Sequence, residues 1–426
     1  MKKIFCILFS ILSILILNLG VLSCVQGENV TTTSSSTSTT STTTTTTTIV
    51  YNTITTNGRF ATINNFYSET LKNNRTIRIY LPESYSTKTD TSFDVLYMDD
   101  GQNVFKPGGT YGCWNMEDVY DNLRKDSLVP DLILVGINFV NRTDEYNPYS
   151  TGDGGGQASN YLKMLTDELI PFLKNNFRIK TDPKNSTFMG SSYGGMNTLY
   201  NIWSRPDVFG KGVCMSGAYF CGNSQFLKEM LSYSGTKKDL KFWIDCGNGA
   251  YEGDDVSSDM FDIDGYIKHN GGDGMRMLFE QNLGMPSVLT KLGYQYETDF
   301  QYFLSYSDAH SESSWNKRAY FALRYIYATT NPTPTEMKVS VFPESVSITQ
   351  TYPSAVIISE VTYDNGLKVT VPIENVTLTS DNDSIFSLYY GRIRIDKKKV
   401  TDDTVVNFTV KYKTFSGSCA LKITKK

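Results

Sequence analysis

The chain has 426 residues, and at about 150 residues per domain this length predicts two or three folded units. Its 40 Lys and Arg residues are nearly balanced by 44 Asp and Glu residues, so the formal net charge of -4 argues against nucleic acid as the main partner. Hydrophobic residues make up 40% and aromatic residues 13%, which excludes a chain that is disordered throughout. Only two histidines occur, His269 and His310, so a histidine-dependent mechanism must use one of them.

The N-terminus has the pattern of a secretion signal. Two lysines after the initial Met precede an apolar run that ends at Leu22. The residues before Cys24 resemble a bacterial lipobox, which would leave this cysteine lipidated, whereas the small residues up to Gly27 suit ordinary cleavage. A third alternative keeps the run as a membrane anchor, because about 20 apolar residues can cross a bilayer. We therefore expect residues 1–27 to direct export to the extracellular space or the cell surface, with the mode of release left open.

Residues 28–49 are expected to form a linker. From Thr31 to Thr48 the sequence is almost entirely Ser and Thr, with too little apolar surface to offset the entropy of ordering. This composition suits a flexible stalk, with or without O-linked sugars. Such a stalk would hold a catalytic or binding unit away from a surface.

Residues 50–331 alternate strand-like and helix-like segments. Residues 76–81 alternate in polarity with a period of two and end at Pro82, which is typical of a strand with one solvated face. Two apolar runs are typical of strands buried on both faces, and two other segments have the apolar spacing of helices. The runs are 93–98 and 132–137, and the helical segments are 116–128 and 161–177. Strands separated by helices predict an α/β fold with a mostly parallel central sheet covered on both sides.

The sequence changes character after Pro332–Pro334. From residue 335 to residue 426 it consists of short strand-like runs with turn signals such as Asp364–Gly366, the spacing of an all-β sandwich. The segment Thr379–Ile385, followed by Gly391–Ile393, resembles bacterial Ig-like modules. We therefore expect residues 50–331 and residues 335–426 to be separate domains, the second an Ig-like β-sandwich.

The cysteines do not form a metal-binding pattern. Cys6 and Cys24 lie in the leader, and no CxxC pair occurs among the others, which are Cys113, Cys214, Cys221, Cys246 and Cys419. An exported chain permits disulfides, so a local pair of Cys214 with Cys221 stays open, but most of these residues are expected as single buried thiols. No metal and no other cofactor is expected.

The strongest chemical signal is a G-x-S-x-G motif centred on Ser192. It follows the strand-like residues 186–189 and precedes the helix-like residues 197–204. In this setting the glycines let strand and helix meet in a sharp turn that exposes the serine, the arrangement called a nucleophile elbow. A serine hydroxyl needs an adjacent base to become a strong nucleophile.

Chain order selects His310 as that base. In folds with this elbow the catalytic groups follow the order serine, acid, histidine. His310 comes after the strand-like residues 300–306 and before a helix-like segment, where a loop histidine would reach back to the elbow. His269 lies in a Gly- and Asp-rich run over residues 262–274 that is typical of a surface insertion.

The acid is expected on the loop after the strand-like residues 240–247. Glu252 is the first choice and Asp254 the second, with Asp255 in the same loop. Its role would be to hold the tautomer of the histidine and to stabilise the imidazolium. Asp245 lies inside the strand, where a structural role is expected.

Two backbone N–H groups should bind the oxygen of the tetrahedral intermediate. One is expected from Tyr193, the residue after the nucleophile. The other is expected from Gln102, on the loop after the strand 93–98, where Gly101 allows a close backbone approach. The residues Asp99–Gly101 fit a plain turn nearly as well.

Taken in chain order, several segments resemble the esterase D and enterochelin-esterase type of α/β-hydrolase, which includes the feruloyl and acetyl xylan esterases of carbohydrate esterase family 1. These segments are Tyr80–Pro82, Val95–Phe105, Trp114 ahead of Met116–Val119, Asn141–Pro148, Glu168–Pro171, Gly190–Gly195, and His310 with Trp315. The resemblance spans roughly Ile54 to Tyr327 and implies a carboxyl-ester hydrolase with Ser192 as nucleophile and His310 as base. The acid loop departs from the family, since Ala250 stands where members usually place the acid. The loop is therefore longer, the acid has moved to Glu252 or Asp254, or the site works as a Ser-His dyad.

The expected substrate is a feruloyl or acetyl ester on xylan, because an exported esterase with a Ser/Thr stalk and an appended β-module has the layout of polysaccharide-degrading enzymes. Trp114 and Trp315, together with Tyr193, are candidates to stack on sugar or aromatic acid, although ordinary aromatic packing fits them too. An enterobactin-type siderophore triester is an alternative substrate, but the sequence offers no basic cluster to receive it. The other alternative is a surface binding or adhesion protein that keeps a hydrolase fold without turnover.

Overall fold

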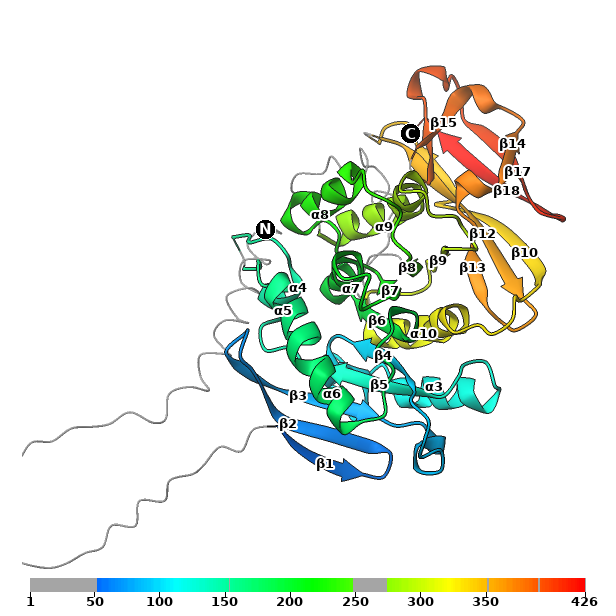
Figure 1. The fold of residues 1–426 in the computed structure, drawn as a ribbon. Coiled ribbons are helices and arrows are strands. Elements are labelled where there is room, and N and C mark those ends of the chain that lie inside the picture. Colours follow the sequence, from blue (N-terminus) through cyan, green and yellow to red (C-terminus); the bar gives the residue numbers. More distant parts are fainter. Residues whose placement is uncertain (1–51, 153, 248–273, 351, 390, 426) are drawn as a thin grey trace, which may run out of the picture. The chain divides into compact units, whose positions relative to one another are not determined.

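The structure is a computed structural model and describes residues 52–152, 154–247, 274–350, 352–389 and 391–425 (Figure 1). The leader expected over residues 1–27 and the linker expected over residues 28–49 lie outside these ranges. The chain from Val50 to Lys426 is one compact unit. Among the helices of the described ranges, none combines the length and the apolar character that a bilayer-spanning segment requires.

The first part of this unit is built on a nine-stranded sheet with the order β1-β2-β3-β5-β4-β6-β7-β8-β9. Its strands are β1 (Thr53–Asn57), β2 (Phe60–Ser68), β3 (Asn73–Tyr80), β4 (Asp94–Met98), β5 (Leu132–Ile137), β6 (Ser186–Ser191), β7 (Lys211–Met215), β8 (Lys241–Cys246) and β9 (Phe300–Leu304). β1, β2 and β3 are antiparallel to their neighbours, and the six strands from β5 to β9 in this order run parallel. The predicted α/β fold with a mostly parallel central sheet is confirmed.

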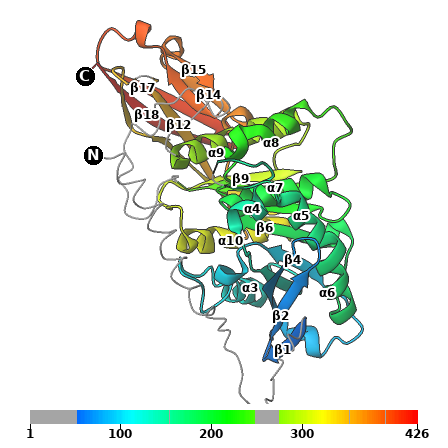
Figure 2. The same ribbon diagram turned by 90° about the vertical axis from the view of Figure 1, so that its left-hand side faces the viewer.

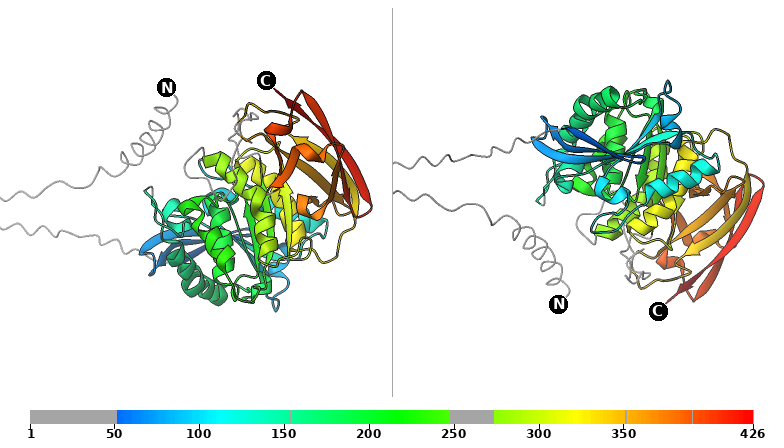
Figure 3. Two further views of the ribbon diagram at one scale, coloured as in Figure 1. Left: turned by 90° about the horizontal axis from the view of Figure 1, so that it is seen from above. Right: turned by 90° about the horizontal axis from the view of Figure 1, so that it is seen from below.

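Helices cover both faces of the sheet (Figures 2 and 3). They are α2 (Gly101–Val104), α3 (Met116–Lys125), α4 (Arg142–Tyr146), α5 (Ala158–Lys163), the π-helix η2 (Met164–Leu169), α6 (Ile170–Asn176), α7 (Tyr193–Ser204), α8 (Cys221–Ser232), α9 (Gly274–Lys291) and α10 (Glu312–Ile326), with short 3-10 turns η1 (Glu83–Ser86) and η3 (Pro183–Asn185). Leu123 of α3 and Leu323 of α10 belong to one buried cluster. Leu165 of η2, Leu199 of α7 and Leu289 of α9 belong to another. The sheet therefore lies between two helical layers.

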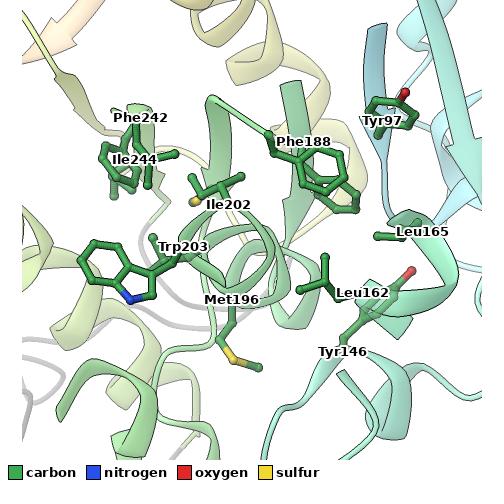
Figure 4. Close-up of a cluster of buried hydrophobic side chains, with 14 of the residues drawn as sticks. Tyr97, Tyr146, Leu162, Leu165, Phe188, Met196, Ile202, Trp203, Phe242 and Ile244 are labelled. Carbon is green, nitrogen blue, oxygen red and sulfur yellow. The ribbon is translucent and has the colours of Figure 1, made fainter. Parts of the chain in front are cut away.

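The larger cluster holds α7 against the strands that precede the site (Figure 4). Ile202 of α7 packs with Phe188 of β6 and with Phe242 and Ile244 of β8. Gly212 of β7 makes room for this helix, because a Cβ atom there would lie 2.4 Å from Ile202 Cδ1. All six residues of β6 are buried, so the strand that leads to the elbow is fixed on both faces.

The predicted helix over residues 161–177 differs in detail from the structure. The segment begins at Ala158 and contains the π-helix η2 between two α-helical segments. Pro171 lies in the first turn of α6 and cannot donate a backbone hydrogen bond to the preceding turn, so the wider π-helical turn precedes it. Sequence patterns did not identify β1, β2, β7 or α8. Cys214 and Cys221 are both free thiols, so the local disulfide is wrong, and with Cys246 they are single buried cysteines as expected.

The C-terminal part consists of two further sheets. One has the order β10-β12-β16-β15 with β13 paired to β12, and the other has the order β11-β18-β17-β14. The strands are β10 (Pro334–Phe342), β11 (Ser345–Ser347), β12 (Ser354–Tyr363), β13 (Lys368–Thr370), β14 (Thr377–Ser380), β15 (Phe386–Tyr389), β16 (Arg392–Ile395), β17 (Thr404–Tyr412) and β18 (Phe415–Thr424), with 3-10 turns η5 (Ile373–Asn375), η6 (Asp383–Ile385) and η7 (Lys397–Lys399). Ala355, Ile393, Phe408 and Leu421 form part of the buried cluster between the sheets, as in a β-sandwich. The Ig-like type and the boundary between residues 331 and 335 stay predictions.

Candidate active site

Ser192 lies at a sharp turn between β6 and α7. Its backbone has φ 58° and ψ -122°, a conformation that is strained for any residue with a side chain. Three hydrogen bonds hold it there: Ser192 N donates to Met215 O at 3.0 Å, and Ser192 O accepts from Met196 N at 3.1 Å and from Ala218 N at 2.9 Å. Ser192 itself is partly exposed. The local geometry is that of a nucleophile elbow.

Close backbone contacts require Gly190, the first glycine of the motif, and Gly195, the residue after its last glycine. A Cβ atom on Gly190 would lie 2.5 Å from Gly194 O, and a Cβ atom on Gly195 would lie 2.7 Å from Met215 O. These neighbours are backbone atoms that cannot move without disturbing the sheet. The spacing of glycines around Ser192 therefore follows from how closely β6, α7 and the end of β7 approach one another.

The loop after β4 is the second element of the site. Asp100 is in the left-handed region with φ 56°, and α2 begins at the next residue. Gly101 is packed so tightly against β5 that a Cβ atom would lie 2.6 Å from the carbonyl carbons of Gly136 and Ile137. The first N–H groups of a helix are not used by the helix itself, and Gln102 is the second residue of α2. Gln102 Oε1 is buried and has no hydrogen-bond partner among the described residues.

Arg142 of α4 connects this loop to the elbow. Its Nε donates to Asp100 Oδ1 at 2.7 Å and its Nη2 to Asp100 Oδ2 at 2.8 Å. The same Nη2 donates to Ser191 O at 3.0 Å. The sequence analysis did not single out this contact, although Arg142 lies in the segment Asn141–Pro148 that carries part of the family resemblance.

Asp99 anchors the end of β4 beneath the site. It accepts hydrogen bonds from Tyr161 Oη and from Asn197 Nδ2, both at 2.8 Å. Burial, and then the neighbouring charge of Asp100, raise the pKa of the Asp99 carboxyl well above its usual range. Asp99 is 1% exposed, so its role is to tie β4 to α5 and α7 rather than to meet a substrate.

His310 lies on the loop between β9 and α10. Its ring contacts Trp315 edge to face, with 4.9 Å between ring centroids. Burial, together with the positive charges of Arg318 and Arg142, lowers the pKa of His310 to about 3. At neutral pH the imidazole is then uncharged, the form in which a histidine can accept a proton. Arg142 also donates to Ser191 O, the carbonyl directly before the predicted nucleophile.

The loop of His310 is tied to the neighbouring strands by Arg318 of α10. This buried guanidinium donates from Nε to Asp245 Oδ1 at 2.9 Å and from Nη2 to Ser216 Oγ at 2.9 Å, and its Nη1 lies 3.5 Å from Asp308 Oδ2. Asp245 also accepts from Trp243 Nε1 at 2.7 Å. Asp245 therefore has the structural role expected for it.

Glu252 and Asp254 lie outside the described residues, as does His269. The strand before them ends next to the histidine loop, because a Cβ atom on Gly247 would lie 2.2 Å from Asp308 O. Within the described ranges, no three His, Cys, Asp or Glu side chains gather closely enough to hold a metal ion.

Trp114 and Trp315 do not lie where a substrate ring could stack. Trp114 is 1% exposed and Trp315 is 5% exposed. They pack against each other with 5.6 Å between ring centroids, within the buried cluster that also contains residues of α3 and α10. Their assignment to substrate binding is corrected to a packing role, because the ring faces are already covered by protein. Tyr193 is partly exposed and stays a candidate.

Comparisons with known proteins show similarity to esterases over part of this chain. The model of the Esterase family, described as "Putative esterase", matches residues 68–261, which include Ser192 but not His310. A protein of Bacillus subtilis described as "Uncharacterized protein YbbA" is 31% identical over 164 residues, and an "Endo-1,4-beta-xylanase/feruloyl esterase" of Xylanibacter ruminicola is 29% identical over 163 residues. The matches cover 37% and 36% of this chain, which spans 62% and 21% of the lengths of the two relatives.

Solved structures are similar at lower identity. A ferulic acid esterase has 15% identity and a TM-score of 0.47, over 63% of this chain and 97% of that one. The enterobactin esterase of Shigella flexneri has 16% identity and a TM-score of 0.45, over 62% of this chain and 58% of that one. The match over residues 68–261 confirms that this chain resembles the Esterase family, as its sequence motifs predict.

Proposed function

We propose that this protein is a serine carboxyl-ester hydrolase that acts through an acyl-enzyme. His310 takes the proton of the Ser192 hydroxyl as the serine oxygen attacks the ester carbonyl. The alcohol then leaves with a proton from His310, and a water molecule activated by the same imidazole releases the acid and regenerates the serine. The observation that supports this most directly is the strained backbone of Ser192, because a turn of this kind is kept where a nucleophile must be exposed.

The N–H groups of Tyr193 and Gln102 would bind the oxyanion in this mechanism. Each belongs to the first turn of a helix that begins at the carboxyl edge of the sheet, α7 and α2. Donors of this kind, fixed before the reaction, stabilise the charge that develops on the carbonyl oxygen. The acid that would orient His310 is proposed to be Glu252 or Asp254.

The proposed substrate is a feruloyl or acetyl ester on a plant cell-wall polysaccharide such as xylan. The relative from Xylanibacter ruminicola described as a xylanase and feruloyl esterase supports this choice. The leader-like residues 1–27 and the Ser/Thr-rich linker favour an exported enzyme that acts outside the cell or at its surface.

The direct test is release of ferulate and acetate from arabinoxylan by the purified chain, beside Ser192→Ala and His310→Ala. Release that both substitutions abolish would support the reaction and the substrate. Cleavage of 4-nitrophenyl acetate through Ser192 without any release from arabinoxylan would keep the esterase and exclude the xylan ester. A chain that cleaves neither, and that is not labelled at Ser192 by a fluorophosphonate, would exclude the serine esterase.

A further inference from the structure

Arg142 makes contacts on two sides of the candidate site. Its guanidinium holds both carboxylate oxygens of Asp100, on the loop after β4, at 2.7 and 2.8 Å. It also holds the carbonyl oxygen of Ser191, directly before the nucleophile, at 3.0 Å. A planar guanidinium fork bound to three acceptors in this way fixes their relative positions more firmly than a flexible ammonium could.

The two residues that Arg142 holds each lie shortly before a predicted oxyanion donor in the chain. Gln102 lies two residues after Asp100, and Tyr193 lies two residues after Ser191. Both segments pass through a left-handed backbone at this point, with φ 56° at Asp100 and φ 58° at Ser192. Strained backbone of this kind persists only when neighbouring contacts hold it in place. The positions of the two N–H groups relative to each other therefore depend on contacts such as those of Arg142.

Arg142 is itself well anchored. Glu145, on the same short helix, forms a buried pair with Arg75, whose Nη1 and Nη2 donate to its two oxygens at 3.0 and 2.9 Å. Tyr146 Oη, one residue further, accepts from Asp100 N at 2.9 Å. Helix α4 thus contacts the loop after β4 at two points, and it is held to β3 by a separate ion pair. These contacts fix helix α4, so the guanidinium of Arg142 can hold the loop after β4 at a constant distance from the elbow.

We propose that Arg142 is a positioning residue that holds the two oxyanion-binding N–H groups at the separation the tetrahedral intermediate needs. Arg142 does not contact the substrate in this role, so it acts on the transition state through the backbone of Gln102 and Tyr193. This inference rests on the proposed function, a serine esterase. Because the hole binds the oxyanion more tightly than the ground-state carbonyl, loss of Arg142 should lower kcat and leave KM nearly unchanged.

The test compares Arg142→Ala and Arg142→Lys with the wild-type chain on 4-nitrophenyl acetate. We expect kcat of Arg142→Ala to fall by about 10²-fold to 10³-fold, the loss typical of one oxyanion donor. Arg142→Lys cannot hold Asp100 and Ser191 together, so kcat should also fall, but by a smaller factor because the positive charge beside Asp100 is kept. If the alanine variant does not fold, the lysine variant carries the same measurements.

Arg59→Ala is the matched control. Arg59 also holds both oxygens of one carboxylate, that of Asp121, at 2.8 and 3.0 Å, and it donates to a backbone carbonyl, that of Leu81, at 2.7 Å. These contacts lie at the amino edge of the parallel strands, away from the candidate site. Leu81 follows Tyr80, which pairs with Leu134 near the beginning of β5. Its removal should leave kcat unchanged, which separates loss of an arginine clamp in general from loss of this one.

Two further readouts distinguish positioning from a merely structural role. A trifluoromethyl ketone forms a tetrahedral adduct with the Ser192 oxygen, so its affinity should fall by the same factor as kcat/KM, while the affinity for ferulate stays unchanged. Added guanidinium ion should restore part of the kcat of Arg142→Ala. Unchanged kcat in Arg142→Ala, or a loss confined to KM, would overturn the proposal while the wild-type chain still cleaves ester. A wild-type chain without Ser192-dependent activity would instead overturn the proposed function, and this inference with it.

Discussion

The two edges of the parallel sheet differ in how they use charge. At the carboxyl edge, the pairs of Arg318 with Asp245 and of Arg75 with Glu145 have side chains that are at most 3% exposed. At the amino edge, the pairs of Lys180 with Asp94 and of Lys237 with Asp299 have lysines that are 43% exposed. The buried pairs connect strands to helices, β8 to α10 and β3 to α4.

This difference indicates which edge needs fixed geometry. Burying two charges costs about as much free energy of hydration as their mutual attraction provides. A buried ion pair therefore adds little to the stability of the fold. An exposed ion pair stays hydrated, and it contributes at most about 1 kcal/mol to the free energy of unfolding. Buried arginines that each reach two or three segments are better explained by the need to hold strained loops in one arrangement, as a preorganised site requires. We therefore expect substitutions at the two edges to have effects of different size and kind.

The largest expected effect is the loss of catalysis in Ser192→Ala. Removal of the nucleophile from a serine enzyme lowers kcat by about 10⁶-fold, and we expect a loss of that order for ester hydrolysis. Ser204→Ala, at the exposed far end of the same helix α7, should keep the wild-type kcat. Steady-state hydrolysis of 4-nitrophenyl acetate by both variants checks this. Comparable rates in the two would place the chemistry away from the elbow.

Next in size is the effect of Arg318→Met on stability. The substitution leaves Asp245 buried with Trp243 as its remaining side-chain partner, and breaking a buried pair in this way costs about 3–5 kcal/mol of unfolding free energy. Lys237→Met breaks the exposed pair with Asp299 and should cost no more than about 1 kcal/mol. Urea unfolding of both variants measures the difference. Equal losses would remove the contrast between the two edges.

The contacts behind this contrast mark the limit of what the sequence alone could predict. The elbow is local, since Gly190, Ser192 and Gly194 are close in the chain, and a Cβ atom on Gly190 would lie 2.5 Å from Gly194 O. Arg318 and Asp245 are 73 residues apart, and Arg142 and Asp100 are 42 residues apart. Which arginine meets which carboxylate depends on strand order, and local patterns do not carry that information.

The solvent exposure of individual aromatic side chains was the other quantity that sequence patterns could not supply. Trp114 and Trp315 are aromatic residues near a predicted site, and this fits both stacking on a ligand and packing in a core. Their rings pack against each other because α3 and α10 cover the same face of the sheet. By contrast, the apolar run Leu132–Ile137 could be identified as a strand without knowing which residues pack against it, and β5 has the predicted bounds.

A smaller effect is expected from Gly195→Ala at the carboxyl edge. The added Cβ atom would lie 2.7 Å from Met215 O and 3.0 Å from Gly217 Cα, and overpacking against such atoms typically costs about 1–3 kcal/mol. Gly152→Ala is the control, because a Cβ atom at Gly152 has no neighbour within 4 Å. Thermal unfolding should show a lowered Tm for Gly195→Ala and an unchanged Tm for Gly152→Ala. A Tm that does not change in Gly195→Ala would mean that elbow and β7 are less tightly packed than described.

The smallest change is expected in the pH dependence of activity. The charges around His310 at the carboxyl edge predict that kcat/KM changes little between pH 7 and pH 5. Burial, Arg318 and Arg142 lower the pKa of His310 to about 3, so its neutral form should persist in the folded protein as pH falls from 7 to 5. The neutral fraction of a histidine with the ordinary pKa of about 6.5 would fall about 25-fold over the same interval. The acidic limb of kcat/KM should therefore lie below pH 5, measured with an ester that does not ionise. A limb at or above pH 6.5 would contradict this prediction.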